Sequence, residues 1–208
     1  VDELGANASI PVINALTDAD HPTQLLADWL TIRENFGTDI AGRKFVYLGD
    51  GNNMSHAWLI MGAIMGAHVV AATPSGKWAP DPVVVAVAKN IASHNGGKVE
   101  VTHDPEAAAK DASVLYTDVW MSMGDSEADR AEKMPALSPF AVTENLMKLT
   151  SKDSLFMHCL PAHRGEEVEA SVIDGPRSVV WREAYHRRTT IQSILYHLIK
   201  GDLKGSTH

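Results

Sequence analysis

Short runs of apolar residues alternate along the chain with longer stretches in which apolar residues recur every three or four positions. A short continuous apolar run is typical of a strand with both faces covered, as in a parallel sheet between helices. Such runs predict strands at residues 10–14, 44–48, 68–72, 98–102, 113–117, 154–158 and 178–181.

The longer stretches have the spacing of helices with one buried face. They predict helices at residues 23–36, 54–65, 82–95, 105–110, about 125–134 and 183–199. Strands and helices that alternate in this way build parallel sheets with right-handed crossovers. The predicted fold class is therefore α/β, an open parallel sheet with helices on both faces, in the three-layer arrangement of Rossmann-like domains.

The composition narrows the classes of partner and compartment. Of the 208 residues, 45% are hydrophobic and 21% are charged, which is ordinary for a globular protein. The formal net charge of -8 argues against nucleic-acid and anionic-membrane partners, because both favour basic patches. The single cysteine excludes an internal disulfide and is typical of a reducing compartment. We therefore expect a cytoplasmic protein, or a mitochondrial matrix protein if a presequence precedes this sequence.

The N-terminal sequence "VDELGANASIPVINAL" lacks the basic segment and apolar block of a signal peptide. It begins without methionine, and "SIPVINAL" predicts a buried strand almost at once. No apolar stretch approaches the roughly 20 residues that span a bilayer. We expect the sequence to be a fragment of a longer protein.

In open α/β sheets, ligands bind beyond the carboxyl ends of the strands, where the strand order reverses. The segments that follow predicted strands are "GDGNNMSH", "ATPSGKW", "DVWMSMGD" and "HCLPAHRG". Three of them are rich in polar or reactive side chains. We therefore expect a ligand site at this edge of the sheet.

In "GDGNNMSH", two asparagines open a predicted helix. Asparagine caps helices well, so a tight turn with a capping side chain is one interpretation. The other is that the helix N-terminus and a side-chain amide bind a carboxylate, such as that of an amino acid. A dinucleotide site is poorly supported, because Met54 stands where the third glycine of G-x-G-x-x-G belongs.

In "DVWMSMGD", Asp118 ends a predicted strand, and Ser122 and Gly124 follow it. Asp and Ser often begin turns, and a turn alone would account for them. Alternatively, Asp118 faces a cationic group such as an ammonium, and the glycine-containing loop closes over the ligand as a lid.

The single cysteine, Cys159, lies at the exit of a predicted strand. A free cysteine is more often an inert buried residue than a nucleophile. His158 adjoins it, but neighbouring strand residues point to opposite faces, so a catalytic Cys–His pair is not supported. The bond between Leu160 and Pro161 is a candidate for the cis form. His158 and His163 are weak evidence for zinc, and we predict no metal site.

In "HPTQLLADWLTI", Pro22 suits the first turn of a helix, and Trp29 and the leucines supply its buried face. His21 stands just before this helix. It either substitutes for a cap or directs its imidazole at an anion beside the helix N-terminus.

Together and in this order, "HPTQLLADWLTI", "GDGNNMSH", "DVWMSMG" and "HCLPAHRGEEV" resemble the ornithine-binding half of the ornithine carbamoyltransferases, from roughly residue 9 to residue 181. The combination of "HCLP" with Asp-x-x-x-Ser-Met-Gly distinguishes this branch from the aspartate carbamoyltransferases. The resemblance implies the amino-acid-binding domain of a transcarbamylase. It also implies a division into a strand and hinge remnant of a preceding domain at residues 1–20, an ornithine-binding domain at 21–182, and a closing helix and tail at 183–208.

The activity implied by this resemblance is transfer of the carbamoyl group of carbamoyl phosphate to the δ-amine of L-ornithine, in arginine biosynthesis or the urea cycle. The products would be L-citrulline and phosphate, and no metal or organic cofactor would be required. The family likeness also suggests a homo-oligomer, a trimer.

The same resemblance assigns roles to individual residues. The ligands of ornithine would be Asn53, Asp118, Ser122, Met123, Cys159 and Leu160. The ligands of carbamoyl phosphate would be His21, Gln24, Leu160 and Arg187. The residues nearest to the chemistry would be Asp118, Cys159 and Arg187, with the thiol as a polarisable partner of the amine rather than a covalent nucleophile.

Two features depart from the family pattern. The N-terminal carbamoyl-phosphate domain, with its Ser-Thr-Arg-Thr-Arg loop, is absent, so we expect this chain alone to bind ornithine weakly and to catalyse poorly or not at all. Tyr185 and His186 precede Arg187 where the family usually has Glu-Asn. The apolar face of the last helix would be exposed, covered by another chain, or packed on this sheet; its residues are Ile191, Ile194, Leu195 and Leu198.

Three other functions stay open from the sequence. A sister transcarbamylase would use another amine or amino acid, since one loop change alters specificity. A non-catalytic amino-acid-binding or assembly module would keep the fold without the phosphate half. A dinucleotide-binding oxidoreductase matches at the level of fold but lacks the glycine fingerprint.

Overall fold

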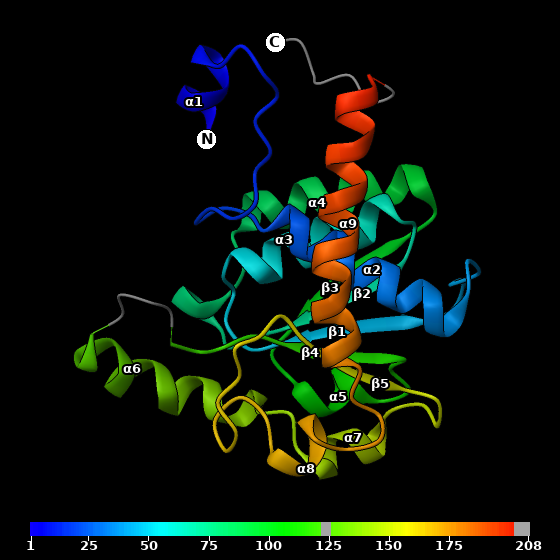
Figure 1. Cartoon of the computed structure of the whole chain (residues 1–208). Coiled ribbons are helices and arrows are strands. Elements are labelled where there is room, and N and C mark those ends of the chain that lie inside the picture. The colour runs from blue at the N-terminus through cyan, green and yellow to red at the C-terminus, as the bar shows by residue number, and fades with distance from the viewer. Residues whose placement is uncertain (122–125, 202–208) are drawn as a thin grey trace.

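The computed structural model describes residues 1–121 and 126–201 of the chain (Figure 1). Within these ranges the centre is a sheet of five parallel strands in the order β3-β2-β1-β4-β5. The strands are β1 (Lys44–Leu48), β2 (His68–Ala72), β3 (Lys98–Thr102), β4 (Val114–Thr117) and β5 (Leu155–His158). The chain runs outward from β1 to β3 and returns to β4 on the other side of β1, so the strand order reverses between β1 and β4. The predicted open parallel sheet is confirmed.

Helices cover both faces of the sheet (Figure 1). One face carries α2 (Pro22–Phe36), α3 (Asn53–Ile64), α4 (Pro82–Asn95) and α9 (Val180–Lys200). The other carries α5 (Pro105–Ala109), α7 (Glu144–Leu149) and α8 (Ala170–Ile173). Outside these layers lie α1 (Asp2–Asn7) and α6 (Glu127–Leu137). Among the described residues, no helix combines the length and apolar composition that crossing a bilayer requires.

The two sides of β1 belong to two different hydrophobic clusters. Phe45 and Tyr47 pack with residues of α2, α3 and α4, whereas Val46 and Leu48 pack with residues of α5, α7 and α8. Successive strand residues point to opposite faces, so a strand between two helical layers must be apolar at every position. This is why the strands appear in the sequence as continuous apolar runs.

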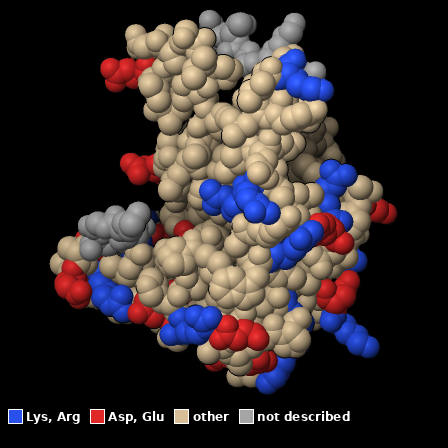
Figure 2. All heavy atoms as spheres, in the orientation of Figure 1, with Lys and Arg blue, Asp and Glu red and all other residues tan. Residues whose placement is uncertain are grey.

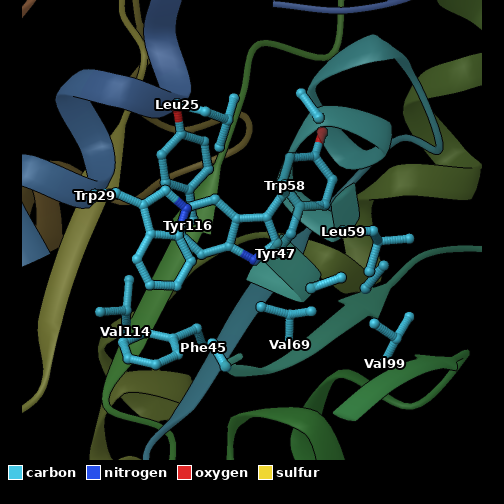
Figure 3. Packing of buried hydrophobic residues seen from close by; sticks show 14 of the residues in the cluster. Leu25, Trp29, Phe45, Tyr47, Trp58, Leu59, Val69, Val99, Val114 and Tyr116 are labelled. Atoms are coloured by element: carbon cyan, nitrogen blue, oxygen red, sulfur yellow. The ribbon is translucent and has the colours of Figure 1, made fainter. Parts of the chain in front are cut away.

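Aromatic side chains fill the layer between α2, α3 and the sheet (Figure 3). The rings of Trp29 and Phe45 lie 5.3 Å apart, and those of Trp58 and Tyr116 lie 4.6 Å apart, measured between centroids. Burying one such side chain contributes about 1.5–3 kcal/mol. The cluster therefore holds β1 and β4 rigidly at the point where the strand order reverses.

Two predicted strands are wrong. Residues 10–14 form no strand, and Ile10 is 73% exposed. Pro11 has no N–H for a strand ladder, and the segment leads away from the sheet towards α1 (Figure 1). The expectation of a strand remnant in residues 1–20 is therefore wrong. Residues 178–181 form no strand either. Ser178 forms only an isolated bridge to Phe156, and α9 begins at Val180.

The first turns of α9 pack on α2 and the sheet, and its C-terminal end projects beyond them (Figure 1). Its buried residues, Val180, Glu183 and His186, all lie in the N-terminal third. Leu195 is exposed, and Ile191, Ile194 and Leu198 are half-buried. The apolar face that the sequence left undecided is thus covered only in part by this chain.

Candidate active site

The expected ligand edge lies at the carboxyl ends of β1, β4 and β5. The turn after β1 passes very close to another stretch of main chain: a Cβ added to Gly51 would lie 2.2 Å from the carbonyl carbon of Ala79. Only glycine fits such an approach. This close packing fixes the path of the chain into α3.

Asn52, which follows this turn, is the N-cap of α3. Its Oδ1 accepts hydrogen bonds from the main-chain N–H groups of Met54 and Ser55, at 3.0 and 3.2 Å, and from the Tyr47 hydroxyl at 3.2 Å. Its Nδ2 is left to donate to Asp118 Oδ2 at 3.2 Å. The neighbouring Asn53 instead donates from Nδ2 to the carbonyl oxygen of Thr17 at 3.1 Å.

Asp118 joins the ends of three strands. Besides the bond from Asn52, its Oδ1 accepts from the main-chain N–H of Val119 at 2.7 Å and from the thiol of Cys159 at 2.9 Å. These donors come from the segments after β1, β4 and β5. The carboxylate is therefore held in one position at the point where the strand order reverses.

The thiol of Cys159 is protonated in this setting. Burial raises its pKa well above the usual range, and the negative charge of Asp118 and the hydrogen bond to it raise it further. A protonated thiol is a weak nucleophile. The arrangement fits a polar contact at the site and gives no support to a covalent role.

His158 and Cys159 point to different partners, as expected for neighbours at the end of a strand. His158 Nε2 lies 3.3 Å from Glu167 Oε1, and its Nδ1 accepts from the main-chain N–H of Leu160 at 2.8 Å. Leu160 has a left-handed backbone, with φ at 56°, and the bond to Pro161 is cis, as proposed from the sequence. These contacts set the direction of the chain as it leaves β5.

A second group of polar side chains lies where α2 meets α9. Arg187 of α9 donates from Nη1 to Gln24 Oε1 and, at 3.4 Å, to His21 Nε2; its Nη2 donates to Thr23 Oγ1 at 3.4 Å. Burial lowers the pKa of His21, and the positive charge of Arg187 lowers it further. His21 does not cap α2 with its side chain. The imidazole is therefore neutral and acts as an acceptor toward the guanidinium.

The two groups belong to one site. Asp118 lies near enough to His21 to raise its pKa, although burial and Arg187 outweigh it. One end of the site thus carries a fixed carboxylate, which suits an ammonium group. The other carries a guanidinium beside the N-terminus of α2, which suits an oxyanion.

Ser122 and Met123, expected as ligands, lie outside the described residues. Within the described ranges, potential metal-ligand atoms of His163, Glu166 and Glu167 lie within 4.8 Å of one another. Arg130 pairs with Glu166 at 2.6 Å, and Glu167 accepts from the main-chain N–H of His163. These partners account for Glu166 and for one oxygen of Glu167, whereas Glu167 Oε2 is buried without a hydrogen-bond partner. The expectation of no metal stays a prediction.

Sequence comparison decides the family. The family model described as "Aspartate/ornithine carbamoyltransferase, Asp/Orn binding domain" matches residues 41–198. The chain belongs to this family. A second model, described as the carbamoyl-P binding domain of the same enzymes, matches residues 1–34. The division expected at residues 20 and 21 stays a prediction, since α2 falls within that second match.

Carbamoyltransferases of archaea and bacteria are similar to the chain. An ornithine carbamoyltransferase of Pyrococcus abyssi is 51% identical over 205 residues, which are 99% of this chain and 64% of that protein. The structure of ornithine carbamoyltransferase from Pyrococcus furiosus has a TM-score of 0.90 and 48% identity, covering 98% of this chain and 64% of that one. The structure of ornithine carbamoyltransferase from Gloeobacter violaceus has a TM-score of 0.86 and 43% identity, covering 95% of this chain and 65% of that one. The chain therefore spans about 64% of the length of the curated relatives it matches.

Three residues that contact the candidate site were not singled out from the sequence. Asn52 is one of them, because the family resemblance assigned the ornithine contact to Asn53 and the helix was predicted to begin at residue 54, one residue later than it does. Asp28 and Glu183 are fully buried acids beside Gln24. In the sequence they look like ordinary polar positions of two amphipathic helices, and only the packing of α9 on α2 brings them together.

Proposed function

We propose that this chain is the ornithine-binding part of an enzyme that transfers the carbamoyl group of carbamoyl phosphate to the δ-amine of L-ornithine. The products are L-citrulline and phosphate. The observation that carries the proposal is the pairing of a fixed carboxylate, Asp118, with the Arg187 group at one switch point. The family relationship supports it, and we further propose a cytoplasmic homo-oligomer, a trimer by family likeness.

Ornithine binds at the end of the site that holds Asp118. The carboxylate receives an ammonium group, and the neighbouring N-terminus of α3 attracts the α-carboxylate. Asn53, Ser122 and Met123 complete this subsite in the proposal. Because Asn52 and Cys159 occupy fixed directions around Asp118, the carboxylate reaches the ligand without rearranging.

Carbamoyl phosphate binds at the other end, against His21, Gln24, Leu160 and Arg187. A guanidinium forms strong charge-assisted hydrogen bonds to phosphate oxygens. One arginine is few donors for a dianion. We therefore propose that a carbamoyl-phosphate-binding domain, of the kind whose family model matches residues 1–34, supplies the others.

The reaction joins the two subsites. The δ-ammonium first loses a proton to water, which a desolvated site makes easier because burial lowers the pKa of an amine. The amine nitrogen then forms a bond to the carbamoyl carbon, the bond from that carbon to the phosphate oxygen breaks, and the electron pair leaves with phosphate. A phosphate oxygen takes the second amine proton. Arg187 stabilises the charge that develops on oxygen, and the chemistry requires no metal or organic cofactor.

Calorimetry with the 208-residue chain tests the ornithine subsite. L-ornithine is titrated into the chain, into Asp118→Asn and into the matched control Asp39→Asn, whose carboxylate is exposed and caps a local turn. We expect Asp118→Asn to weaken ornithine binding at least about tenfold, as loss of one charged hydrogen bond does, and the control to bind normally. Tighter binding of L-aspartate or another amino acid than of ornithine would favour a sister transcarbamylase.

Citrulline formation tests the transferase itself. The chain is assayed with saturating ornithine and carbamoyl phosphate, beside Cys159→Ala. Little or no citrulline from the chain, with ornithine still bound, supports the division of the site between two domains. Strong activity that Cys159→Ala abolishes would contradict this division, because all ligands of the phosphate would then lie within the 208-residue chain. Absence of both binding and activity would favour an assembly module.

A further inference from the structure

Two buried carboxyl groups lie behind the side chains proposed to bind carbamoyl phosphate. Asp28 of α2 and Glu183 of α9 are both fully buried. Removing a carboxylate from water costs several kcal/mol unless partners compensate. The proposed chemistry uses neither residue, so their retention beside the site requires another explanation.

Both acids hold the side-chain amide of Gln24. Gln24 Nε2 donates to Asp28 Oδ1 at 2.7 Å and to Glu183 Oε1 at 3.1 Å. The second oxygen of Glu183 accepts from the main-chain N–H of His158 at 3.1 Å. Through these bonds, one amide connects α2, α9 and the end of β5.

The partners of Gln24 allow one orientation of its amide. A guanidinium has five donors and no acceptor, so the Gln24 atom that faces Arg187 must be the carbonyl oxygen. The NH2 group then faces the two acids, and each supplies an acceptor. If the amide were rotated by half a turn, its NH2 would oppose the guanidinium and its oxygen would oppose carboxyl oxygens.

Burial also raises the pKa of both acids. Burial raises the pKa of Asp28 to about 7, while the hydrogen bond from Gln24 and the positive charge of Arg187 oppose that rise. Burial, and then the charge of Asp28, raise the pKa of Glu183 well above its usual value. Arg187 and Cys159 are the other charged or titratable groups that face the pair. Burial therefore makes both acids hold protons more tightly than exposed carboxyl groups do, and both offer an oxygen to Gln24.

We propose that Asp28 and Glu183 are positioning residues that fix the Gln24 amide, and through it the Arg187 guanidinium, in the orientation that binds carbamoyl phosphate. The role at that ligand rests on the proposed function. The orientation of Gln24 and Arg187 does not, and it can be measured separately.

Glu183→Gln is the decisive variant. A carboxyl group offers acceptors to both Gln24 and His158, whereas a glutamine amide has a single oxygen and must present NH2 to one of them. Glu183→Asp keeps the acid with a shorter side chain. Glu34→Gln is the matched control, because Glu34 also joins α2 to α9, through Arg182 at 2.7 Å, without contacting Gln24.

The first measurement is nuclear magnetic resonance of the Gln24 side-chain amide and the Arg187 Nε–H in the 208-residue chain. In the wild type and Glu34→Gln, we expect Gln24 amide protons that exchange slowly with water. In Glu183→Gln, we expect exchange at least about tenfold faster and a shifted Arg187 signal, with Glu183→Asp in between. Unchanged signals in Glu183→Gln would overturn the proposal.

The second measurement titrates carbamoyl phosphate into the same samples. We expect at least about tenfold weaker binding by Glu183→Gln than by Glu34→Gln. A freed Gln24 amide with undiminished carbamoyl phosphate affinity would overturn the proposal and leave a purely structural pair. If the wild type shows no response to carbamoyl phosphate, binding requires the further ligands that we propose a second domain supplies, and the positioning of Arg187 is decided by the amide signals.

A second variant covers the case in which Glu183→Gln does not fold. The side chain introduced by Asp28→Asn still has one oxygen for Gln24, whereas Asp28→Leu leaves no acceptor. In Asp28→Asn we expect the slow exchange of the Gln24 amide to persist, and in Asp28→Leu we expect exchange at least about tenfold faster. Slow exchange in Asp28→Leu would overturn the proposal.

Discussion

The chemistry of Cys159 depends on the carboxylate that it contacts. Its thiol donates to Asp118, and both burial and that negative charge favour the protonated form. Thiolate, not thiol, reacts with alkylating agents. Burial and the contact with Asp118 thus make this cysteine unreactive.

We predict that Cys159 reacts with iodoacetamide at neutral pH at least about tenfold more slowly than a free cysteine peptide, because its pKa is raised. Asp118→Asn should accelerate the reaction, since it removes the charge that disfavours the thiolate. The chain has no other cysteine, so mass spectrometry reports this site directly. A wild-type rate equal to that of the peptide would contradict the prediction, and Asp39→Asn serves as the unchanged control.

At the scale of single residues, the sequence predicted side chains that the structure brings together, but not their geometry, and their roles as ligands stay predictions. Asp118, Cys159, His21, Gln24 and Arg187 were expected, and the structure brings them into two adjoining groups. The family resemblance assigned Asn53 to ornithine, whereas the bond to Asp118 comes from Asn52, which is the N-cap because α3 begins one residue earlier than predicted. The acids at 28 and 183 are 155 positions apart along the chain (183 minus 28), so only tertiary packing reveals them.

Three strands and one helix were predicted with the bounds that the structure gives them. The strands are β1 and β2, which are continuous apolar runs, and β3, and the helix is α4, which has an Asp-Pro start and a glycine after its last residue. The predicted strand at 10–14 failed. Its apolar residues belong to a surface that this chain leaves exposed, and apolar composition alone does not state which chain covers it.

Helix α3 depends on its first turn. Asn52 caps it with bonds to two main-chain N–H groups and also receives the buried Tyr47 hydroxyl. We predict that Asn52→Ala lowers the free energy of unfolding by about 1–2 kcal/mol, measured by urea denaturation, because a cap and the partner of a buried hydroxyl are lost.

The matched control for the cap is Asp104→Ala. Asp104 caps α5 with bonds to the N–H groups of Glu106 and Ala107, both at 3.0 Å, at an exposed position away from the site. Asp104→Ala should lower the free energy of unfolding by about 1 kcal/mol without changing the affinity for ornithine. Asn52→Ala should weaken ornithine binding as well, since it also releases Asp118. Equal ornithine affinity in the two variants would show that the contact of Asn52 with Asp118 has no part in binding.

At the scale of the whole molecule, the acids that bind protons more tightly after folding make stability depend on pH. The pKa of Asp28 is about 7 in the folded chain, against 3.8 in its reference state, and the pKa of Glu183 is raised too. A raised pKa means that the folded chain binds more protons than the unfolded chain between these values. The stabilising contribution of Asp28 to the free energy of unfolding is then complete below about pH 4 and is lost as the pH rises through about 7.

We predict that the free energy of unfolding of the wild type falls relative to that of Asp28→Asn as the pH rises from about 4 to about 7. Urea denaturation of both proteins across this range measures the difference, in which the titrations of His21, His56 and the surface acids largely cancel. A difference that is constant with pH would mean that the pair titrates in the same way in the folded and unfolded chains.

The end of the molecule that carries α1 and the tip of α9 exposes apolar side chains. Leu4 is 64% exposed, Tyr196 54% and Ile199 86%, and Figure 2 shows few charged atoms over this region. Exposed apolar clusters mark surfaces that another chain or domain covers. Residues 1–34, which include Leu4, match a carbamoyl-P binding domain, and we propose that a domain of this kind covers the surface.

We predict that the 208-residue chain, without that domain, covers this surface by associating with itself. In sedimentation velocity, the wild type should sediment faster as its concentration rises, and Ile199→Asp should reduce the effect, because a carboxylate in an apolar contact costs several kcal/mol when unpaired. Leu149→Asp, at a 40% exposed leucine of α7 on the opposite face of the sheet, should behave as the wild type. A sedimentation coefficient independent of concentration would mean that the surface is stable in water, and the apolar side chains would then be no sign of a missing domain.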